Sequence, residues 1–331
     1  MSGGRSSTLG PGPEFDRIRA VAGALGAAAR GLGDDCARID FPRGIPLVST
    51  DVSVELVHFR RDWLRDEEIG WRAASAALSD LAAMGAAPAG LVVAVTMPPE
   101  LDEAVLVDFM RGVGEAATSV GTAVLGGDLS RGSACALAVT VFGAATTPIL
   151  RSGARPGDQL WVTGQLGGPR AALEAFVAGT APNDEARARF AHPEPRIAAG
   201  LAFARLGASA MIDLSDGLVA DAAHLAAASH AEVVLELEGV PVLPGTEAAA
   251  GRVGLSPQVF AAGSGEEYEL LVALPSSVSA EAVARFAAEL QLPITRIGDV
   301  RAGPPGVHAT FGGKPVTVVG FQHFGGPSAS R

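Results

Sequence analysis

Residues 45–59 alternate apolar and polar side chains in the way that a half-buried β-strand does. Val52 and Val54 alternate there with Asp51 and Ser53. Because successive side chains of a strand point to opposite faces, this pattern predicts a strand with one apolar and one polar face. Asp51 is then expected at the mouth of a strand and not inside a core.

The segment that follows has the composition of an α-helix. Asp66, Glu67 and Glu68 bring negative charge to its N-terminus, an alanine-rich stretch runs through Met84, and Gly85 comes next. Acids in the first turn and a glycine after the last turn are the usual signals for where a helix begins and ends. We therefore expect a helix over residues 66–84.

Asp80 is the one charged residue on a face of this helix. Positions 73, 76, 77, 80, 83 and 84 share that face, and they read Ala, Ala, Ala, Asp, Ala and Met. A carboxylate that faces protein is costly unless it is paired, hydrogen-bonded or bound to a metal ion. The alternative is that this alanine face is exposed to solvent.

Further periodic segments divide the chain into two parts. In the first part, strands are expected at residues 91–96, 122–125 and 135–142, and the second of these runs into Gly126-Gly127-Asp128. In the second part, strands and helices alternate; the expected elements are strands 159–163, 210–212, 233–237 and 269–272, a helix opened by Pro169, and helices 216–229 and 280–290. Ser215 or Asp216 could cap the helix that begins near residue 216.

The length of 331 residues favours two domains, because single cores stop growing near this size. We expect a tail at 1–14 that is too polar and glycine-rich to fold, an N-terminal domain at 15–148 and a C-terminal domain at 149–331. The fold class is α/β (α+β). No apolar run has the length of a membrane span, the start lacks the apolar core of a secretory signal, and the two cysteines indicate no disulfide framework. We therefore expect a cytoplasmic protein.

The net charge and the acidic residues of the chain limit the functions that it can have. The formal net charge is −11 and the only lysine is Lys314, which argues against nucleic acid as a partner because the phosphate backbone is bound by clustered Lys and Arg. Seven aspartates nevertheless stand beside small or apolar residues, and such carboxylates hold oxygen-preferring cations like Mg²⁺. They are Asp34, Asp35, Asp51, Asp80, Asp128, Asp213 and Asp216. We interpret the chain as a metal-dependent phosphoryl-transfer enzyme.

Two common phosphate-binding designs are excluded. A Walker A loop needs a lysine followed by Ser or Thr, whereas Lys314 is followed by Pro315. A protein-kinase site needs a lysine on a strand, with a catalytic-loop Asp and Asn. Positive charge for phosphate must therefore come from metal ions and from arginines such as Arg131 and Arg151.

The motifs, taken in order, give a resemblance to a known family. They are Gly31-Leu32-Gly33-Asp34-Asp35, Ser49-Thr50-Asp51 with His58-Phe59, Leu78-Ser79-Asp80-Leu81, Gly126-Gly127-Asp128 with Arg131, Arg151-Ser152-Gly153-Ala154, Asp213-Leu214-Ser215-Asp216-Gly217, and Gly265-Glu266-Glu267-Tyr268-Glu269. With these motifs the chain resembles the thiamine-monophosphate kinases, which belong to the aminoimidazole ribonucleotide synthetase superfamily. The resemblance extends from about residue 15 to residue 324.

The resemblance implies a homodimer whose mixed-sheet N-terminal domains pair into a β-barrel, with ATP and thiamine monophosphate bound between the two domains of each subunit. It implies several Mg²⁺ ions held by Asp35, Ser49, Thr50, Asp51, Asp80, Asp128, Asp213 and Asp216, of which Asp51, Asp80, Asp128 and Asp216 are the expected catalytic residues. ATP would contact Gly127, Asp128, Arg151, Ser215 and the position of Met110. The thiamine part would contact His58, Glu266 and Phe321.

The chain departs from the family pattern at a few positions, and other functions are also compatible with its sequence. Leu129-Ser130 replaces a pair of threonines, and Met110 stands where members often carry a tyrosine near adenine. The expected reaction is direct in-line transfer from ATP to thiamine monophosphate. The alternatives are a purine-pathway synthetase of the same superfamily and a catalytically silent nucleotide-binding scaffold.

Overall fold

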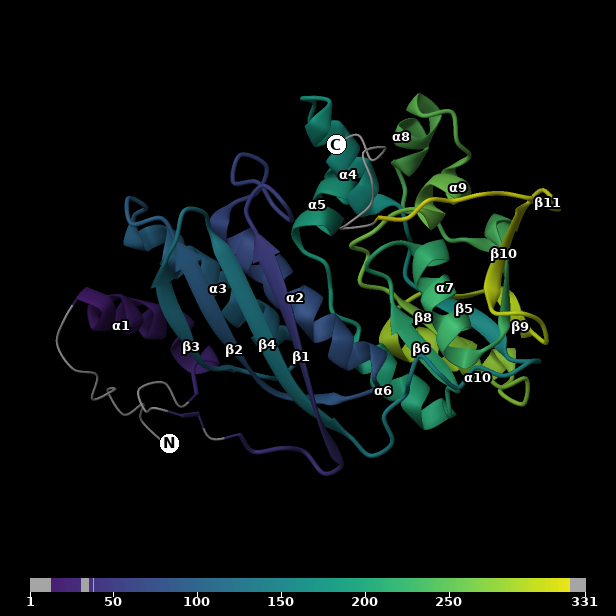
Figure 1. Ribbon diagram of the computed structural model, residues 1–331, viewed down its shortest axis with the longest axis horizontal. Coiled ribbons are helices and arrows are strands. Elements are labelled where there is room, and N and C mark those ends of the chain that lie inside the picture. Colours follow the sequence, from purple (N-terminus) through teal and green to yellow (C-terminus); the bar gives the residue numbers. More distant parts are fainter. Residues whose placement is uncertain (1–12, 31–35, 38, 322–331) are drawn as a thin grey trace. The chain divides into compact units, whose positions relative to one another are not determined.

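The computed structural model describes residues 13–30, 36–37 and 39–321 (Figure 1). The chain divides into two compact units, one formed by Met1–Leu81 and Ala87–Thr146 and the other by Ala82–Ala86 and Thr147–Arg331. Each unit is built around its own sheet. No helix in the described ranges is long and apolar enough to cross a membrane.

The first unit is a four-stranded mixed sheet with helices. Its elements are α1 (Pro13–Leu25), η1 (Gly26–Ala28), β1 (Ile45–Val54), α2 (Asp66–Ala83), β2 (Ala87–Met97), α3 (Glu103–Ser119), β3 (Val124–Arg131) and β4 (Ala136–Ala145). The strand order is β1-β4-β2-β3, with β2 and β3 parallel and the other pairs antiparallel. In Figure 1, α2 and α3 lie behind this sheet.

Helices α2 and α3 approach closely because glycines stand at their contact. A Cβ atom added to Gly70 would meet the carbonyl oxygen of Phe109 at 1.9 Å, and one added to Gly112 would meet the carbonyl oxygen of Glu67 at 1.8 Å. Small residues are therefore required on both helices. This packing covers one face of the sheet, whose inward side chains Leu137, Val139 and Val141 on β4 are fully buried.

The polar side of β1 is the covered one. Ser49 and Asp51 are half-buried, whereas the side chains of Val48 and Val52, on the opposite face, are 65% and 49% exposed. Asp51 also lies within β1, paired with Val139, and not at the mouth of the strand as its sequence context suggests. The strand pairs with β4 along its whole length, which extends it past this acid.

The second unit has a seven-stranded sheet in the order β11-β10-β7-β9-β5-β8-β6. Its elements are β5 (Gln159–Thr163), α4 (Gly168–Val177), α5 (Asp184–Ala191), α6 (Ile197–Leu206), β6 (Ala210–Asp213), α7 (Leu218–Ser229), β7 (Glu232–Glu236), η2 (Leu237–Gly239), α8 (Thr246–Arg252), α9 (Pro257–Ala262), β8 (Leu270–Leu274), α10 (Ala280–Leu290), β9 (Ile294–Arg301), β10 (Gly306–Phe311) and β11 (Lys314–Pro315). Among these strands β7 and β10 pair in parallel and the other pairings are antiparallel.

Both units therefore combine helices with a mixed sheet, as the fold class α/β (α+β) requires. The core of the second unit lies between its sheet and α7, where Leu218, Leu225 and the strand residues Ile212, Leu235 and Val300 are buried. The β-barrel expected from paired first units would need a second copy of the chain.

Candidate active site

Three of the expected metal ligands meet between β1 and α2. The hydroxyl of Ser49 donates a hydrogen bond to a carboxylate oxygen of Asp80. Burial, together with the nearby carboxylate of Asp80, raises the pKa of Asp51 to about 6. The alanine face of α2, which carries Asp80, thus packs on the sheet and not against solvent.

Thr50 and Asp128 lie on the other face of the same sheet. The Thr50 hydroxyl is 3.0 Å from that of Thr140, its cross-strand partner on β4. The register aligns Val52, Ala138, Ala94 and Asp128 across the four strands. Paired residues share a face, so Asp128 points to the side opposite Asp51. Any contribution of Thr50 to an ion at Asp51 would have to come from its main-chain oxygen.

Gly126-Gly127-Asp128 is part of β3 and does not follow it. A Cβ atom at Gly127 would meet the carbonyl oxygen of Val93 at 2.0 Å, so the glycine permits β3 to pair closely with β2. Asp128 is exposed and accepts a hydrogen bond of 3.0 Å from the Ser130 hydroxyl. Strands β1 and β3 are three spacings apart, which is about 14 Å.

The first unit therefore holds Ser49, Asp51 and Asp80 on one face of its sheet and Thr50 and Asp128 on the other. Among residues 13–30, 36–37 and 39–321, no three His, Cys, Asp or Glu side chains are grouped as a metal site. Asp35 lies outside the described residues.

In the second unit, a loop between β6 and α7 carries three further site residues. Asp213 ends β6 and is buried, and Ser215 and Asp216 follow it. The expectation that Ser215 or Asp216 caps α7 is wrong, because the N-cap is Gly217 and no side chain caps there. Asp221, in the first turn of α7, accepts the backbone N–H groups of residues 215, 216 and 217 instead, at 3.1, 3.1 and 3.0 Å.

This arrangement makes Asp221 the anchor of the loop. One carboxylate oxygen accepts all three hydrogen bonds, and the side chain is 2% exposed. Burial raises the pKa of Asp221 to about 7, with Asp213 and Asp216 contributing in the same direction. An acid four positions after Gly217 in an otherwise alanine-rich helix was the sequence signal for this role.

Two of the expected substrate residues join the same loop. The N–H of Glu266 donates to the carbonyl of Ser215 at 2.7 Å, and the N–H of Phe321 donates to the carbonyl of Asp216 at 3.0 Å. The Phe321 side chain is 54% exposed. The second unit thus brings together Ser215, Asp216, Glu266 and Phe321, which are up to 106 positions apart in the sequence.

The remaining site residues occupy different environments. The ring of His58 accepts a hydrogen bond at Nδ1 from the N–H of Val54, 3.1 Å away, just after β1. Met110 lies on α3 and is only 5% exposed, so it offers almost no surface to a ligand. Arg151 is exposed, and its carbonyl accepts a 2.9 Å hydrogen bond from the Ser229 hydroxyl, which fixes the backbone that carries it.

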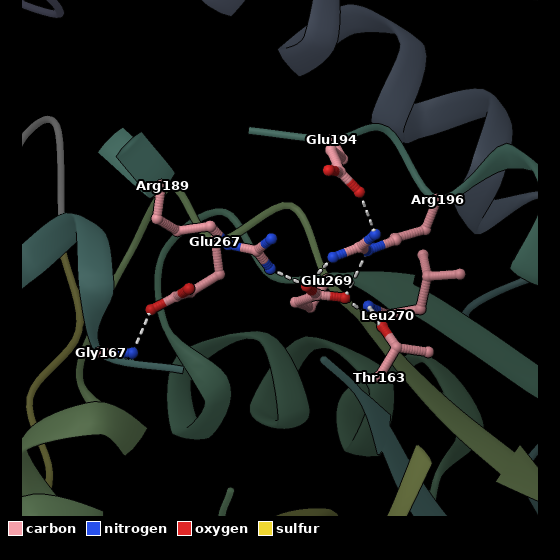
Figure 2. Close-up of polar contacts among 8 residues, drawn as sticks. All are labelled: Thr163, Gly167, Arg189, Glu194, Arg196, Glu267, Glu269 and Leu270. Atoms are coloured by element: carbon pink, nitrogen blue, oxygen red, sulfur yellow. Dashed lines mark hydrogen bonds and ion pairs between the residues drawn. The ribbon is translucent and has the colours of Figure 1, made fainter. Parts of the chain in front are cut away.

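Sequence reasoning missed a buried polar network around Glu267 and Glu269 (Figure 2). Glu267 and Glu269 are 1% and 0% exposed. Glu267 accepts the N–H of Gly167 at 2.5 Å, and Glu269 forms ion pairs with Arg189 and Arg196. An acid directly before the apolar run of β8, together with arginines in an acidic chain, was the signal that could have found this network.

Glu267 should make the stability of the protein depend on pH. Burial raises its pKa to about 7 from an ordinary value of 4.5, although Arg189 opposes this shift. Between these two pH values the folded state holds a proton that the unfolded state has released, so the free energy of unfolding falls as pH rises through the window. Glu267→Gln should flatten this fall in urea unfolding followed from about pH 4 to about pH 8.

The control for this measurement is Glu289→Gln, which changes an exposed glutamate on α10. It should leave the pH dependence of the unfolding free energy as in the original protein. An unchanged slope in Glu267→Gln would mean that Glu267 is ionised in the folded state throughout the window.

Comparison with known proteins places the chain among relatives along its length. Residues 33–145 match the family "AIR synthase related protein, N-terminal domain", and residues 155–309 match "AIR synthase related protein, C-terminal domain". Thiamine-monophosphate kinase of Escherichia coli (strain K12) is 35% identical over 323 residues, which cover 95% of this chain and 96% of that protein.

Solved structures of similar fold include proteins with the same description. Thiamine-monophosphate kinase from Stenotrophomonas maltophilia K279a has a TM-score of 0.78 at 33% identity, covering 91% of this chain and 96% of that chain. The structure described as "AaThiL complexed with AMPPCP and TMP" has a TM-score of 0.76 at 30% identity, covering 94% and 97%.

Proposed function

We infer the function of this chain from its family: it belongs to the thiamine-monophosphate kinases, within the AIR synthase related proteins. It is an enzyme that transfers a phosphoryl group from ATP to thiamine monophosphate and forms thiamine diphosphate. The observation that carries this conclusion is the likeness over 94% of the chain to AaThiL complexed with AMPPCP and TMP, since AMPPCP is an ATP analogue. A purine-pathway synthetase or a silent scaffold is not favoured by these relatives. Because ATP is the co-substrate, we propose that the enzyme works in the cytoplasm.

Mg²⁺ is the proposed metal, and the donor atoms between β1 and α2 fit it. Asp51 and Asp80 supply carboxylate oxygens close enough to influence each other's charge, and Ser49 adds a hydroxyl. Mg²⁺ prefers such oxygen ligands and shares its remaining positions with phosphate. The other proposed ligands are Asp35, Thr50, Asp128, Asp213 and Asp216. When bound, the ions would neutralise charge on the phosphate oxygens.

The protein's own groups are proposed to bind and orient the two substrates. The acceptor phosphate has a second pKa of about 6 and is largely a dianion at neutral pH, so no general base is required. Arg151 would steady the polyphosphate of ATP, with Gly127 and Ser215 as further contacts. In-line transfer then depends on holding the two anionic groups in the reactive geometry.

Residues of the second unit are proposed to bind the thiamine part. The thiazolium ring is a permanent cation, which a carboxylate such as Glu266 and an aromatic face such as Phe321 attract. Both residues pair through their backbone N–H groups with the Ser215–Asp216 loop. His58 is proposed as a further substrate contact. Because Met110 is buried, we expect adenine to make at most a slight contact with it.

We propose that the enzyme is a homodimer in which the first units pair through their sheets into a β-barrel. The face of β1 away from α2 carries the exposed side chains of Val48 and Val52. Exposed apolar side chains on a sheet face are typical of an interaction surface, and β1 is an edge strand. A second copy of the chain presents the same face and would cover it symmetrically.

Val48→Asp should weaken this dimer. The side chain of Val48 is 65% exposed, so the substitution costs the single protein little, but it would bring two charges into the apolar interface. Sedimentation velocity should show a shift from dimer toward monomer. Val177→Asp is the matched control, because Val177 is a similarly exposed valine on α4, and it should leave the sedimentation coefficient unchanged. A Val48→Asp protein that remains dimeric would exclude this face as the interface.

The proposed activity is tested by incubating the protein with ATP, Mg²⁺ and thiamine monophosphate. Thiamine diphosphate and ADP should appear in equal amounts. Release of inorganic phosphate that requires formylglycinamidine ribonucleotide would point to the purine-pathway reaction instead. Nucleotide binding without product would indicate a silent scaffold.

A further inference from the structure

The segment that carries Glu266 has an unusual backbone. Glu266 has a φ of 56° and Tyr268 a φ of 52°, both in the left-handed region that residues other than glycine seldom adopt. Such a conformation is strained for a residue with a side chain and persists only where the surroundings fix it. Something in the second unit must therefore hold residues 266–268 in this conformation.

Glu269 is held by more polar contacts than its neighbours in this segment. Its carboxylate is contacted by Arg196 through Nε at 2.8 Å and Nη2 at 2.6 Å, and it also forms an ion pair with Arg189. The Thr163 hydroxyl donates to it at 2.6 Å and accepts the N–H of Leu270 at 2.8 Å. Figure 2 shows these groups converging on Glu269 from three separate segments of the chain.

The space around this carboxylate is closed. A Cβ atom at Gly164 would lie 2.0 Å from a carboxylate oxygen of Glu269, and the side chain is 0% exposed. Glu267 provides a second fixed point two positions earlier, where it accepts the N–H of Gly167. The partners of these two carboxylates leave little freedom for the backbone between them.

The opposite side of the segment is held by the loop of the candidate active site. The N–H of Glu266 donates to the carbonyl of Ser215 at 2.7 Å, and that of Tyr268 donates to the carbonyl of Leu214 at 2.9 Å. Glu266 is therefore half-buried, whereas the acids that follow it, Glu267 and Glu269, are buried and hydrogen-bonded. The backbone geometry of Glu266 decides where its carboxylate can reach.

We propose that Glu269, held by Arg189 and Arg196, is a positioning residue that keeps Glu266 in its left-handed conformation and so aims the Glu266 carboxylate at the cationic part of the acceptor substrate. This inference rests on the proposed function of Glu266 as a substrate contact. Glu269 itself is too deeply buried to touch the substrate.

Steady-state kinetics of Glu269→Gln, in the complete enzyme with ATP and Mg²⁺, test the proposal. The KM for thiamine monophosphate should rise by about tenfold or more, while the KM for ATP changes by less than about twofold, because only the contact with the acceptor is misplaced. Glu194→Gln is the matched control. It removes the other carboxylate bonded to Arg196, at 2.6 Å, from an exposed position, and should leave both constants unchanged.

A double-mutant cycle separates positioning from general support of the fold. If Glu269 acts through Glu266, adding Glu269→Gln to Glu266→Gln should raise the KM for the acceptor by less than about twofold further. Full additivity of the two effects would overturn the proposal. A rise in the two KM values by the same factor would also overturn it, because that result indicates a general loss of structure.

If Glu269→Gln does not fold, Arg196→Lys tests the same contact. Lysine keeps the positive charge but cannot contact Glu269 through two nitrogens as Arg196 does. Crystal structures of this variant and of the original enzyme give a readout that is independent of activity. We expect Glu266 to leave the left-handed region in the variant; an unchanged φ at residue 266 would refute positioning by Glu269. Absence of thiamine diphosphate with the original enzyme would refute the proposed function alone, and the φ at residue 266 would still decide the role of Glu269.

Discussion

Asp80→Asn is expected to lower kcat/KM for thiamine diphosphate formation by at least about a thousandfold, equal to roughly 4 kcal/mol of transition-state stabilisation. Asp80 lies beside Asp51 and accepts the Ser49 hydroxyl, so it belongs to the group of oxygens proposed to hold Mg²⁺. An amide keeps the hydrogen bond but removes the negative charge. Asp128→Asn should act in the same direction, from the other face of the sheet.

The fold should tolerate this change. In the protein without metal, Asp80→Asn removes the repulsion between two neighbouring carboxylates, so the melting temperature should stay the same or rise. The rise in melting temperature on adding Mg²⁺ should become smaller. Asp62→Asn is the control, because Asp62 pairs with Arg60 at an exposed position of the same unit. Turnover of Asp80→Asn equal to that of the original enzyme would remove the metal argument for this residue.

Asp221→Ala is expected to lower the free energy of unfolding by roughly 3 kcal/mol, because three backbone N–H groups lose their shared acceptor. Activity should fall as well, since the loop that these bonds hold carries Ser215 and Asp216. Asp221→Asn keeps an oxygen at this position and should show a smaller loss. Urea unfolding and the kinase assay measure the two effects.

Asp184→Ala provides the comparison for this substitution. Asp184 is an exposed acid in the first turn of α5, and its removal should cost less than about 1 kcal/mol of unfolding free energy. If Asp221→Ala costs no more than this control, water replaces the carboxylate and Asp221 does not anchor the loop.

Local signals predicted many of the helices and strands well. The acids and alanines of residues 66–84 indicate a helix, and α2 spans Asp66–Ala83; residues 280–290 likewise correspond to α10. The first strand was predicted through residue 59 but ends at Val54, because Leu56 turns into the left-handed region with a φ of 66°. Helix α3 was not predicted, although Asp102 caps it by accepting the N–H of Ala104.

The arrangement of the strands depends on contacts that local patterns do not contain. Strand β4 lies between β1 and β2, and β5 lies between β8 and β9. These neighbours are set by the burial of whole faces and not by any single segment. For the same reason the alternation in β1 did not show which of its faces α2 covers.

Acids that stand alone among small residues are the candidate ligands that the sequence indicates most directly. Asp80 on its alanine face and the pair Asp213 and Asp216 are such acids, and their role as ligands stays a prediction. Sequence reasoning missed Asp221, although its partners are only four to six positions away, and it missed Glu269, whose arginine partner Arg196 is 73 positions away in the chain. Thr50 and Asp128 lie on the sheet face opposite Asp51. For Asp128 this follows from the pairing register of the strands, which the alternation within one strand does not contain.

The exposed valines of β1 have a consequence for how firmly this chain stays folded. In the proposed dimer a second copy would cover them, and association and folding would then be linked by mass action, so dilution should favour unfolding even if no contact within one chain changes. The enzyme would then be most robust in cells that make it abundantly. Its melting temperature would then depend on the protein concentration as well as on the sequence.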